Sequence, residues 1–106
     1  MKTIQQWQKE ITDAANKKYP NNKNWSEIDR LASILRNYDD VRGTIEAEKG
    51  LEVSTYPTNR TPDHRIAALV ADIFILCEMR KIDLEKEMQE VLNWFSDVNA
   101  KRSNEA

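Results

Sequence analysis

The stretch Ile66-Ala67-Ala68-Leu69-Val70-Ala71-Asp72-Ile73-Phe74-Ile75-Leu76-Cys77 is the most apolar part of this chain, and it decides the fold. A helix that is apolar nearly all round is typical of the centre of a helical protein. Asp72 is the one charged residue in this stretch, and a carboxylate is costly to bury unless its charge is compensated. An arginine, a hydrogen-bond network or a metal ion could compensate it, and the choice bears on whether the protein is an enzyme.

Turn and capping signals around this stretch predict four helices. Thr61-Pro62-Asp63 is a strong helix start, and Ser26 with Asp29 three residues later imitates a capping box. All three prolines fall between the candidate helices, which favours an all-α fold. The expected helices run from Thr3 to Lys18, from Ser26 to Gly50, from Thr61 to about Arg80, and from Asp83 onward.

The other three helices are expected to be amphipathic, because apolar residues recur in them at helical spacing. We predict a single helical domain over residues 1–100, arranged as a four-helix bundle and completed by dimerisation, with a polar tail at 101–106. The stripes expected to face the core are Ile4, Trp7 and Ile11 in the first helix, Ile28, Leu31, Leu35, Tyr38, Val41 and Ile45 in the second, and Leu84, Met88, Val91, Leu92, Phe95 and Val98 in the last.

Composition excludes several functional classes. The 16 basic and 18 acidic residues give a formal charge of −2, so the basic excess of a nucleic-acid binder is not seen.

The apolar stretch is shorter than the roughly 20 residues that span a bilayer, so no membrane contact is expected. Met1-Lys2-Thr3 leads into a polar segment rather than a signal peptide, and we expect a cytoplasmic protein. Cys77, the single cysteine, is expected in the core.

The order of these elements resembles the MazG-like all-α NTP pyrophosphohydrolases. In that family a Trp-containing helix precedes a helix with an EExxE box, and an ExxD helix is followed by a Gly-Ile-Asp-Leu turn. Four segments carry the resemblance, over most of residues 3 to 98: Ile4-Gln5-Gln6-Trp7-Gln8-Lys9-Glu10-Ile11, Arg30-Leu31-Ala32-Ser33-Ile34-Leu35, Leu69-Val70-Ala71-Asp72-Ile73-Phe74 and Lys81-Ile82-Asp83-Leu84-Glu85-Lys86.

The resemblance implies a Mg²⁺ cofactor held by four acids from two helices, which would position a nucleoside triphosphate and activate water. This chain does not supply those acids. The EExxE positions fall on Arg36, Asn37 and Asp40. The ExxD positions fall on Leu69 and Asp72, or, if the last turn is matched without a gap, on Arg65 and Ala68.

The candidate metal ligands are therefore the residual acids Asp40 and Asp72, and the candidate phosphate-binding residues are Arg36 and Arg65. We favour an ion pair between Asp72 and Arg36 (or Arg42) over a residual metal site that would add Asp39 and Glu46 or Glu48. For the group Arg60, His64 and Arg65, a solvated helix end is favoured over phosphate binding. Trp7 is expected in the core, Trp25 is expected to pack locally, and Trp94 could face a partner.

Two functions follow. The first is a MazG-like nucleotide-handling protein with weak or lost hydrolysis, which binds a nucleoside triphosphate between the second and third helices. The alternative is a non-enzymatic helical module that self-associates, as a homodimer or higher oligomer, or binds another protein. The missing acids favour the second function as the present activity, and the ordered resemblance favours the first for ancestry and fold.

Overall fold

The computed structural model describes residues 1–51 and 61–97, and these are helical almost throughout. None of the described residues forms a strand, so the predicted all-α class is confirmed. No described helix is long and apolar enough to cross a membrane. The elements are α1 (Ile4–Lys18), the 3₁₀-helix η1 (Pro20–Asn24), α2 (Glu27–Glu48), α3 (Pro62–Met79) and α4 (Leu84–Ser96).

Each α-helix begins at a side chain that caps it, as the sequence predicts. The Thr3 hydroxyl accepts from the backbone N–H of Gln6, whose side chain accepts from the Thr3 N–H in return. Ser26 and Asp29 form the same reciprocal arrangement at the start of α2. Thr61 and Asp83 cap α3 and α4. Each such cap is worth about 1 kcal/mol, so the helix starts are defined locally.

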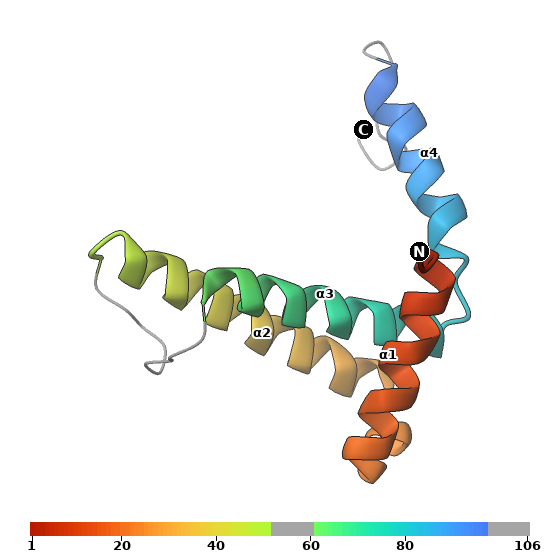
Figure 1. The fold of residues 1–106 in the computed structure, drawn as a ribbon, viewed down its shortest axis with the longest axis horizontal. Coiled ribbons are helices and arrows are strands. Elements are labelled where there is room, and N and C mark those ends of the chain that lie inside the picture. The colour runs from red at the N-terminus through yellow and green to blue at the C-terminus, as the bar shows by residue number, and fades with distance from the viewer. Residues whose placement is uncertain (52–60, 98–106) are drawn as a thin grey trace.

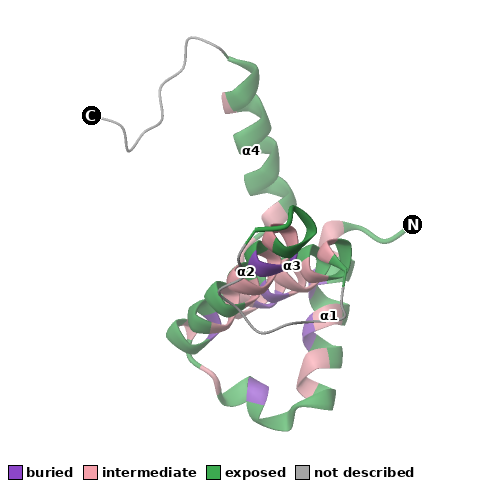
Figure 2. Cartoon of the chain, turned by 90° about the vertical axis from the view of Figure 1, so that its left-hand side faces the viewer, coloured by how far each residue is buried: buried purple, intermediate pink, exposed green. Residues whose placement is uncertain are grey.

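The helices pack around α3. In Figure 1, α2 and α3 lie side by side, α1 crosses one end of this pair, and α4 extends away from it. Figure 2 shows that α4 is exposed along nearly its whole length. Within one chain, therefore, α1, α2 and α3 pack together, whereas α4 meets mainly α1 and does not close a four-helix bundle.

From Ile28 to Tyr38 the apolar row of α2 faces outward, contrary to the predicted core stripe, whereas Val41 and Ile45 at the end of that stripe are half-buried. Ile28 is 73% exposed and Leu35 is 61% exposed, and Leu31 and Tyr38 are also exposed. The fully buried residues of α2 are Arg30, Gly43 and Thr44, so polar groups rather than the predicted apolar row occupy its most buried positions. Helical spacing correctly locates such a stripe, but it cannot say whether the same chain covers it.

The central helix α3 is covered on two sides and open on a third. Asp72, Ile75 and Cys77 are buried, whereas Ile66, Val70 and Ile73 are exposed. Burial raises the pKa of the Cys77 thiol, so the thiol stays protonated near neutral pH, consistent with its predicted place in the core.

Trp7 is not a core residue, contrary to the prediction from the α1 stripe. Its side chain is 46% exposed, and the Lys2 ammonium lies 4.4 Å from its ring centroid. The buried positions of α1 are polar instead, Gln8 and Thr12. Gln8 Nε2 donates to Glu78 Oε2 at 2.8 Å, so α1 is attached to the end of α3 by a hydrogen bond as well as by packing.

A complete Schellman motif ends α3 and sets the direction of α4. The Ile82 N–H donates to the Cys77 carbonyl at 3.0 Å, and the Lys81 N–H donates to the Glu78 carbonyl at 3.2 Å. Lys81 has a positive φ of 56°, in the position that glycine usually occupies. Asp83 then caps α4 and also accepts from Gln5 Nε2 of α1 at 2.8 Å. The turn between α3 and α4 is therefore fixed by hydrogen bonds to α3 and to α1.

We predict that Lys81→Gly raises the free energy of unfolding by about 1 kcal/mol, because a non-glycine residue in the left-handed region costs about 1–2 kcal/mol and the added chain entropy of glycine offsets part of the gain. Chemical denaturation followed by circular dichroism checks this. Lys86→Gly, in the regular first turns of α4, is the matched control and should be destabilising. A loss of stability in Lys81→Gly would show that the lysine side chain stabilises the turn.

Candidate functional site

Asp72 lies in the α2–α3 seam and is bound by three donors from α2. Its Oδ1 accepts from Arg30 Nη1 at 2.7 Å, and its Oδ2 accepts from Ser33 Oγ at 2.6 Å and from Asn37 Nδ2 at 2.9 Å. The side chains of Arg30 and Asp72 are 4% and 6% exposed. Positions 30, 33 and 37 share one face of a helix, so a single helix delivers all three donors. The buried carboxylate is compensated by an arginine and a hydrogen-bond network together.

Arg30 is also held on its other side. Its Nη2 donates to Asn22 Oδ1, and Asn22 Nδ2 donates to Asn16 Oδ1 at 2.7 Å. The guanidinium carbon lies 4.6 Å from the ring centroid of Trp25, a distance at which cation–π attraction operates. Arg30 Nε is buried without a hydrogen-bond partner. The ion pair thus connects α3, α2, η1 and α1.

This arrangement corrects the expected partner of Asp72. The compensating residue is an arginine of α2, as expected, but it is Arg30 rather than Arg36 or Arg42. Arg36 is exposed, and Arg42 pairs within α2 with Glu46 at 3.5 Å. The expectation followed the box positions of the MazG-like family, whereas the observed helix packing places residues 30, 33 and 37 opposite Asp72.

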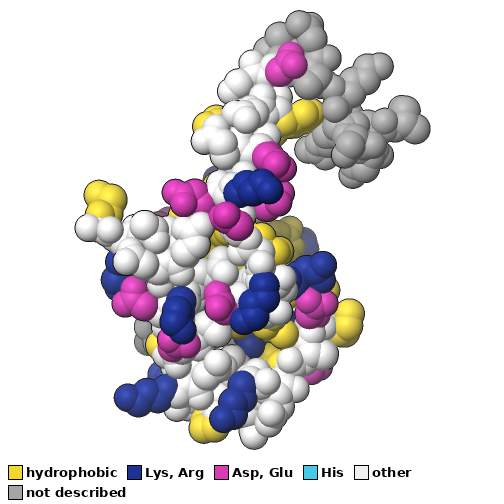
Figure 3. Space-filling view, turned by 90° about the vertical axis from the view of Figure 1, so that its right-hand side faces the viewer, with side chains coloured by type: hydrophobic (Ala, Val, Ile, Leu, Met, Phe, Trp, Pro, Cys, Tyr) yellow, Lys and Arg dark blue, Asp and Glu magenta, His cyan; other side chains and the backbone are white. Residues whose placement is uncertain are grey.

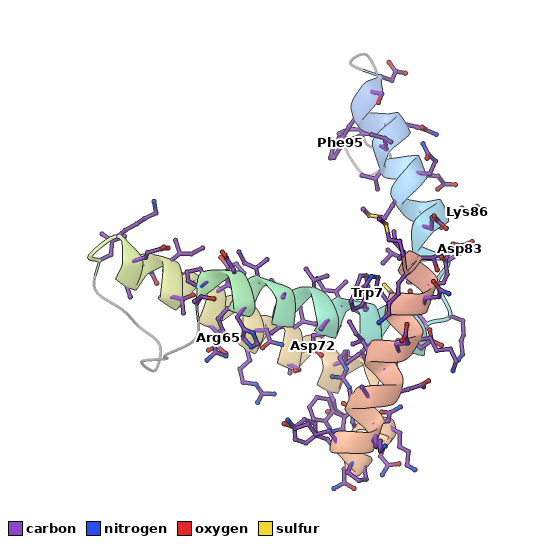
Figure 4. The ribbon with its side chains drawn as sticks, viewed as in Figure 1. Trp7, Arg65, Asp72, Asp83, Lys86 and Phe95 are labelled. Atoms are coloured by element: carbon purple, nitrogen blue, oxygen red, sulfur yellow. The ribbon has the colours of Figure 1, made fainter. Side chains whose placement is uncertain are left out.

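The other predicted site residues lie elsewhere along the seam. Arg65 Nη1 is 3.3 Å from Asp40 Oδ2, so a candidate phosphate-binding residue pairs with a candidate metal ligand. Figure 4 shows Arg65 and Asp72 at separate points along α3. Asp40 and Asp72 therefore belong to different ion pairs, each with its own arginine. His64 is exposed at the start of α3.

The residues around Asp72 do not fit a Mg²⁺ site. Mg²⁺ takes oxygen ligands, whereas the groups aimed at Asp72 are donors from a guanidinium, a hydroxyl and an amide. Within residues 1–51 and 61–97, no group of three or more His, Cys, Asp or Glu side chains could hold a metal ion. The positive charge that a cation would bring to the carboxylate is supplied by the Arg30 guanidinium.

A third arginine–carboxylate pair completes a row along the seam. Arg80 Nη1 lies 3.0 Å from both carboxylate oxygens of Glu27, in an exposed position at one end. The Arg30–Asp72 pair follows, and Arg65–Asp40 lies toward the other end. The arginine comes from α3 in the outer pairs and from α2 in the central pair. Exposed ion pairs contribute little to stability, whereas removal of one partner of the buried central pair would leave an uncompensated charge.

An open cavity of about 760 Å³ lies beside the ion pair, between η1, α1, α2 and α3. Its lining includes the aromatic rings of Tyr19 and Trp25 and the side chain of Lys18, and Arg30 and Asp72 line it too. Its size is within the range of small-molecule sites. Both carboxylate oxygens of Asp72 already accept hydrogen bonds, so the cavity offers a ligand aromatic and cationic surface rather than a free carboxylate base.

Arg30 is the residue that sequence reasoning missed. The resemblance places it in the lead-in to the first acidic box rather than among the site residues. Its spacing to Ser33 and Asn37 was the available signal, because the three form a polar row beside an apolar row on the same helix. Comparison with protein-family models, curated proteins and solved structures found no significant match for the chain.

Proposed function

We propose that this protein is a non-enzymatic helical module that self-associates, built on a MazG-like arrangement of helices in which the Arg30–Asp72 pair stands where a metal centre would be. The observation that carries the proposal is the orientation of α2, which turns its polar side to α3 and its apolar side outward. An outward apolar row of this kind supports the proposal, because large exposed apolar patches are rare on monomers and are typical of interaction surfaces.

The outward rows of α2 and α3 lie on the same face of their helix pair. Successive residues turn by about 100° around a helix, so the rows lie away from Asn37 on α2 and from Asp72 on α3. Because the two helices are antiparallel, this rotation brings both rows to one side, and α1 packs against α3, where Gln8 bonds to Glu78. We call this surface the hairpin apolar face: Ile28, Leu31, Leu35, Tyr38, Ile66, Val70 and Ile73.

A second copy of the chain is the proposed partner. Pairing two copies covers the hairpin apolar face of each, and the buried area of a symmetric dimer is counted from both copies. We expect sedimentation velocity at micromolar concentration to give a species of twice the 12.4 kDa chain mass, with dissociation on dilution. A single monomeric species across millimolar to nanomolar concentrations would contradict the proposal.

Nucleotide binding without hydrolysis is the second candidate, and the cavity beside Trp25 and Tyr19 supports it. The rings could stack a base, and Lys18 could meet a phosphate. A thermal-shift series with nucleoside triphosphates, with and without Mg²⁺, tests it. A ligand at about 100-fold above its Kd adds about 2.7 kcal/mol, a rise in Tm of roughly 10 °C. Release of pyrophosphate would instead show that the protein hydrolyses nucleoside triphosphates.

A further inference from the structure

α4 carries an apolar row that the other described residues leave uncovered. Met88, Val91, Leu92 and Phe95 are all exposed, and Phe95 is 64% exposed. The spacing of these four residues places them on one side of the helix. We call this row the α4 apolar stripe. A helix of 13 residues with this much uncovered apolar surface is marginal by itself in water and needs a packing partner.

The α3–α4 turn prevents α4 from covering the hairpin apolar face of its own chain. The Schellman motif at Lys81 and Ile82 fixes the exit direction, and the bond from Gln5 to Asp83 holds the start of α4 against α1. Figure 4 shows Asp83 and Lys86 near α1 and Phe95 far out along α4. α4 is therefore directed away from the hairpin apolar face of its own chain.

The α4 apolar stripe is shorter than the α2 row of the hairpin apolar face. The stripe spans residues 88 to 95, a rise of about 10 Å at 1.5 Å per residue. The α2 row spans residues 28 to 38, a rise of about 15 Å. A helix laid along the face would thus contact about two-thirds of the α2 row, with the α3 row alongside.

One ion pair is available between the two surfaces. α4 holds Glu85, Glu87 and Glu90 against the single cation Lys86. Figure 3 shows acidic side chains gathered where α4 leaves the rest of the molecule. On α2, Arg42 continues the outward row one turn beyond Tyr38; its side chain is 57% exposed and pairs with Glu46 at 3.5 Å. A carboxylate of an α4 helix on this face would share that guanidinium with Glu46.

We propose that α4 of one copy lies along the hairpin apolar face of a second copy, and that the exchange is reciprocal. This rests on the proposed self-association and names the segment that makes the contact. In a two-fold dimer each chain contributes both its face and its α4, so the exchange forms two such contacts at once. Doubling the contact brings the assembly toward the roughly 800 Å² per partner that stable interfaces bury.

Cysteine cross-linking tests the exchange on the full-length chain. Leu35→Cys places a thiol in the middle of the hairpin apolar face, and Val91→Cys and Met88→Cys place one in the α4 apolar stripe. The native Cys77 is buried, so the wild-type chain is the background control. Glu90→Cys, on the opposite side of α4, is the matched control for the stripe. Equimolar pairs of variants are mixed, oxidised mildly and separated on a non-reducing gel.

We expect the Leu35→Cys chain to cross-link to a Val91→Cys or Met88→Cys chain at least ten times more than to a Glu90→Cys chain. Efficient cross-linking of Leu35→Cys to itself, with none to α4, would overturn the exchange but leave self-association standing, because the faces would then meet directly. Monomeric wild-type protein in sedimentation would overturn the self-association itself. The two failures are thus distinguished.

Discussion

Arg30→Met lowers the free energy of unfolding by about 3–5 kcal/mol, because removal of one partner of a buried ion pair leaves the other charge uncompensated. In this variant Asp72 keeps Ser33 and Asn37 as donors but loses the only cation that contacts it in the described ranges. Methionine retains most of the side-chain volume, so the effect reports charge rather than a cavity. Urea denaturation at one fixed protein concentration measures it, since association also shifts apparent stability.

Two further variants make this expectation specific. Arg36→Met removes an exposed arginine from the same helix and should change stability by less than about 0.5 kcal/mol. The double variant Arg30→Met with Asp72→Leu removes both charges and should recover most of the loss, since apolar replacement of a whole buried pair is often neutral or stabilising. A loss below 1 kcal/mol in the single variant would mean that water or a rearranged cation compensates Asp72.

Leu35→Glu should convert the protein to a monomer, with a rise in Kd of at least 100-fold. A carboxylate in the middle of the hairpin apolar face loses its hydration on association, which costs several kcal/mol per ion, and 2.8 kcal/mol already corresponds to about 100-fold. A symmetric dimer carries the substitution twice. Because Leu35 is 61% exposed within its own chain, the monomer should keep its helical circular dichroism. Sedimentation velocity across a dilution series measures the change.

The control for Leu35→Glu is Arg36→Glu, which adds a carboxylate one residue later, on a side of α2 away from the apolar row. We expect Arg36→Glu to leave the dissociation constant within about threefold of the wild type. If Leu35→Glu remains fully associated, the hairpin apolar face is not the contact surface, whatever the oligomeric state of the wild type.

The helix starts were predictable because their determinants are local. Thr3, Ser26, Thr61 and Asp83 each cap a helix through a contact only three residues away, and such spacing is visible in the sequence. The partner of Asp72 was not predictable in this way. Arg30 lies 42 residues from it, and their pairing depends on how α2 and α3 pack. The box spacing of the MazG-like family instead indicated Arg36, further along α2.

Which side of each helix is covered was also not predictable from one chain. The periodicity of Ile28, Leu31, Leu35 and Tyr38 correctly gives a single apolar side for α2. An apolar side has the same sequence signature whether it meets its own chain or another. One sequence signal indicates that the opposite side of α2 meets α3. It is the row of polar donors at 30, 33 and 37, because the buried charge of Asp72 requires compensation.

The alternation of arginines along the α2–α3 seam has a consequence for how the two helices are aligned. Glu27 meets Arg80, Arg30 meets Asp72, and Asp40 meets Arg65, so donor and acceptor change helix from one pair to the next. If one helix slid past the other by a turn of about 5.4 Å, the buried Asp72 would lose its guanidinium. The information that aligns the two helices therefore resides in the seam itself. Evolution or design could change the length of the connection between them without shifting their register.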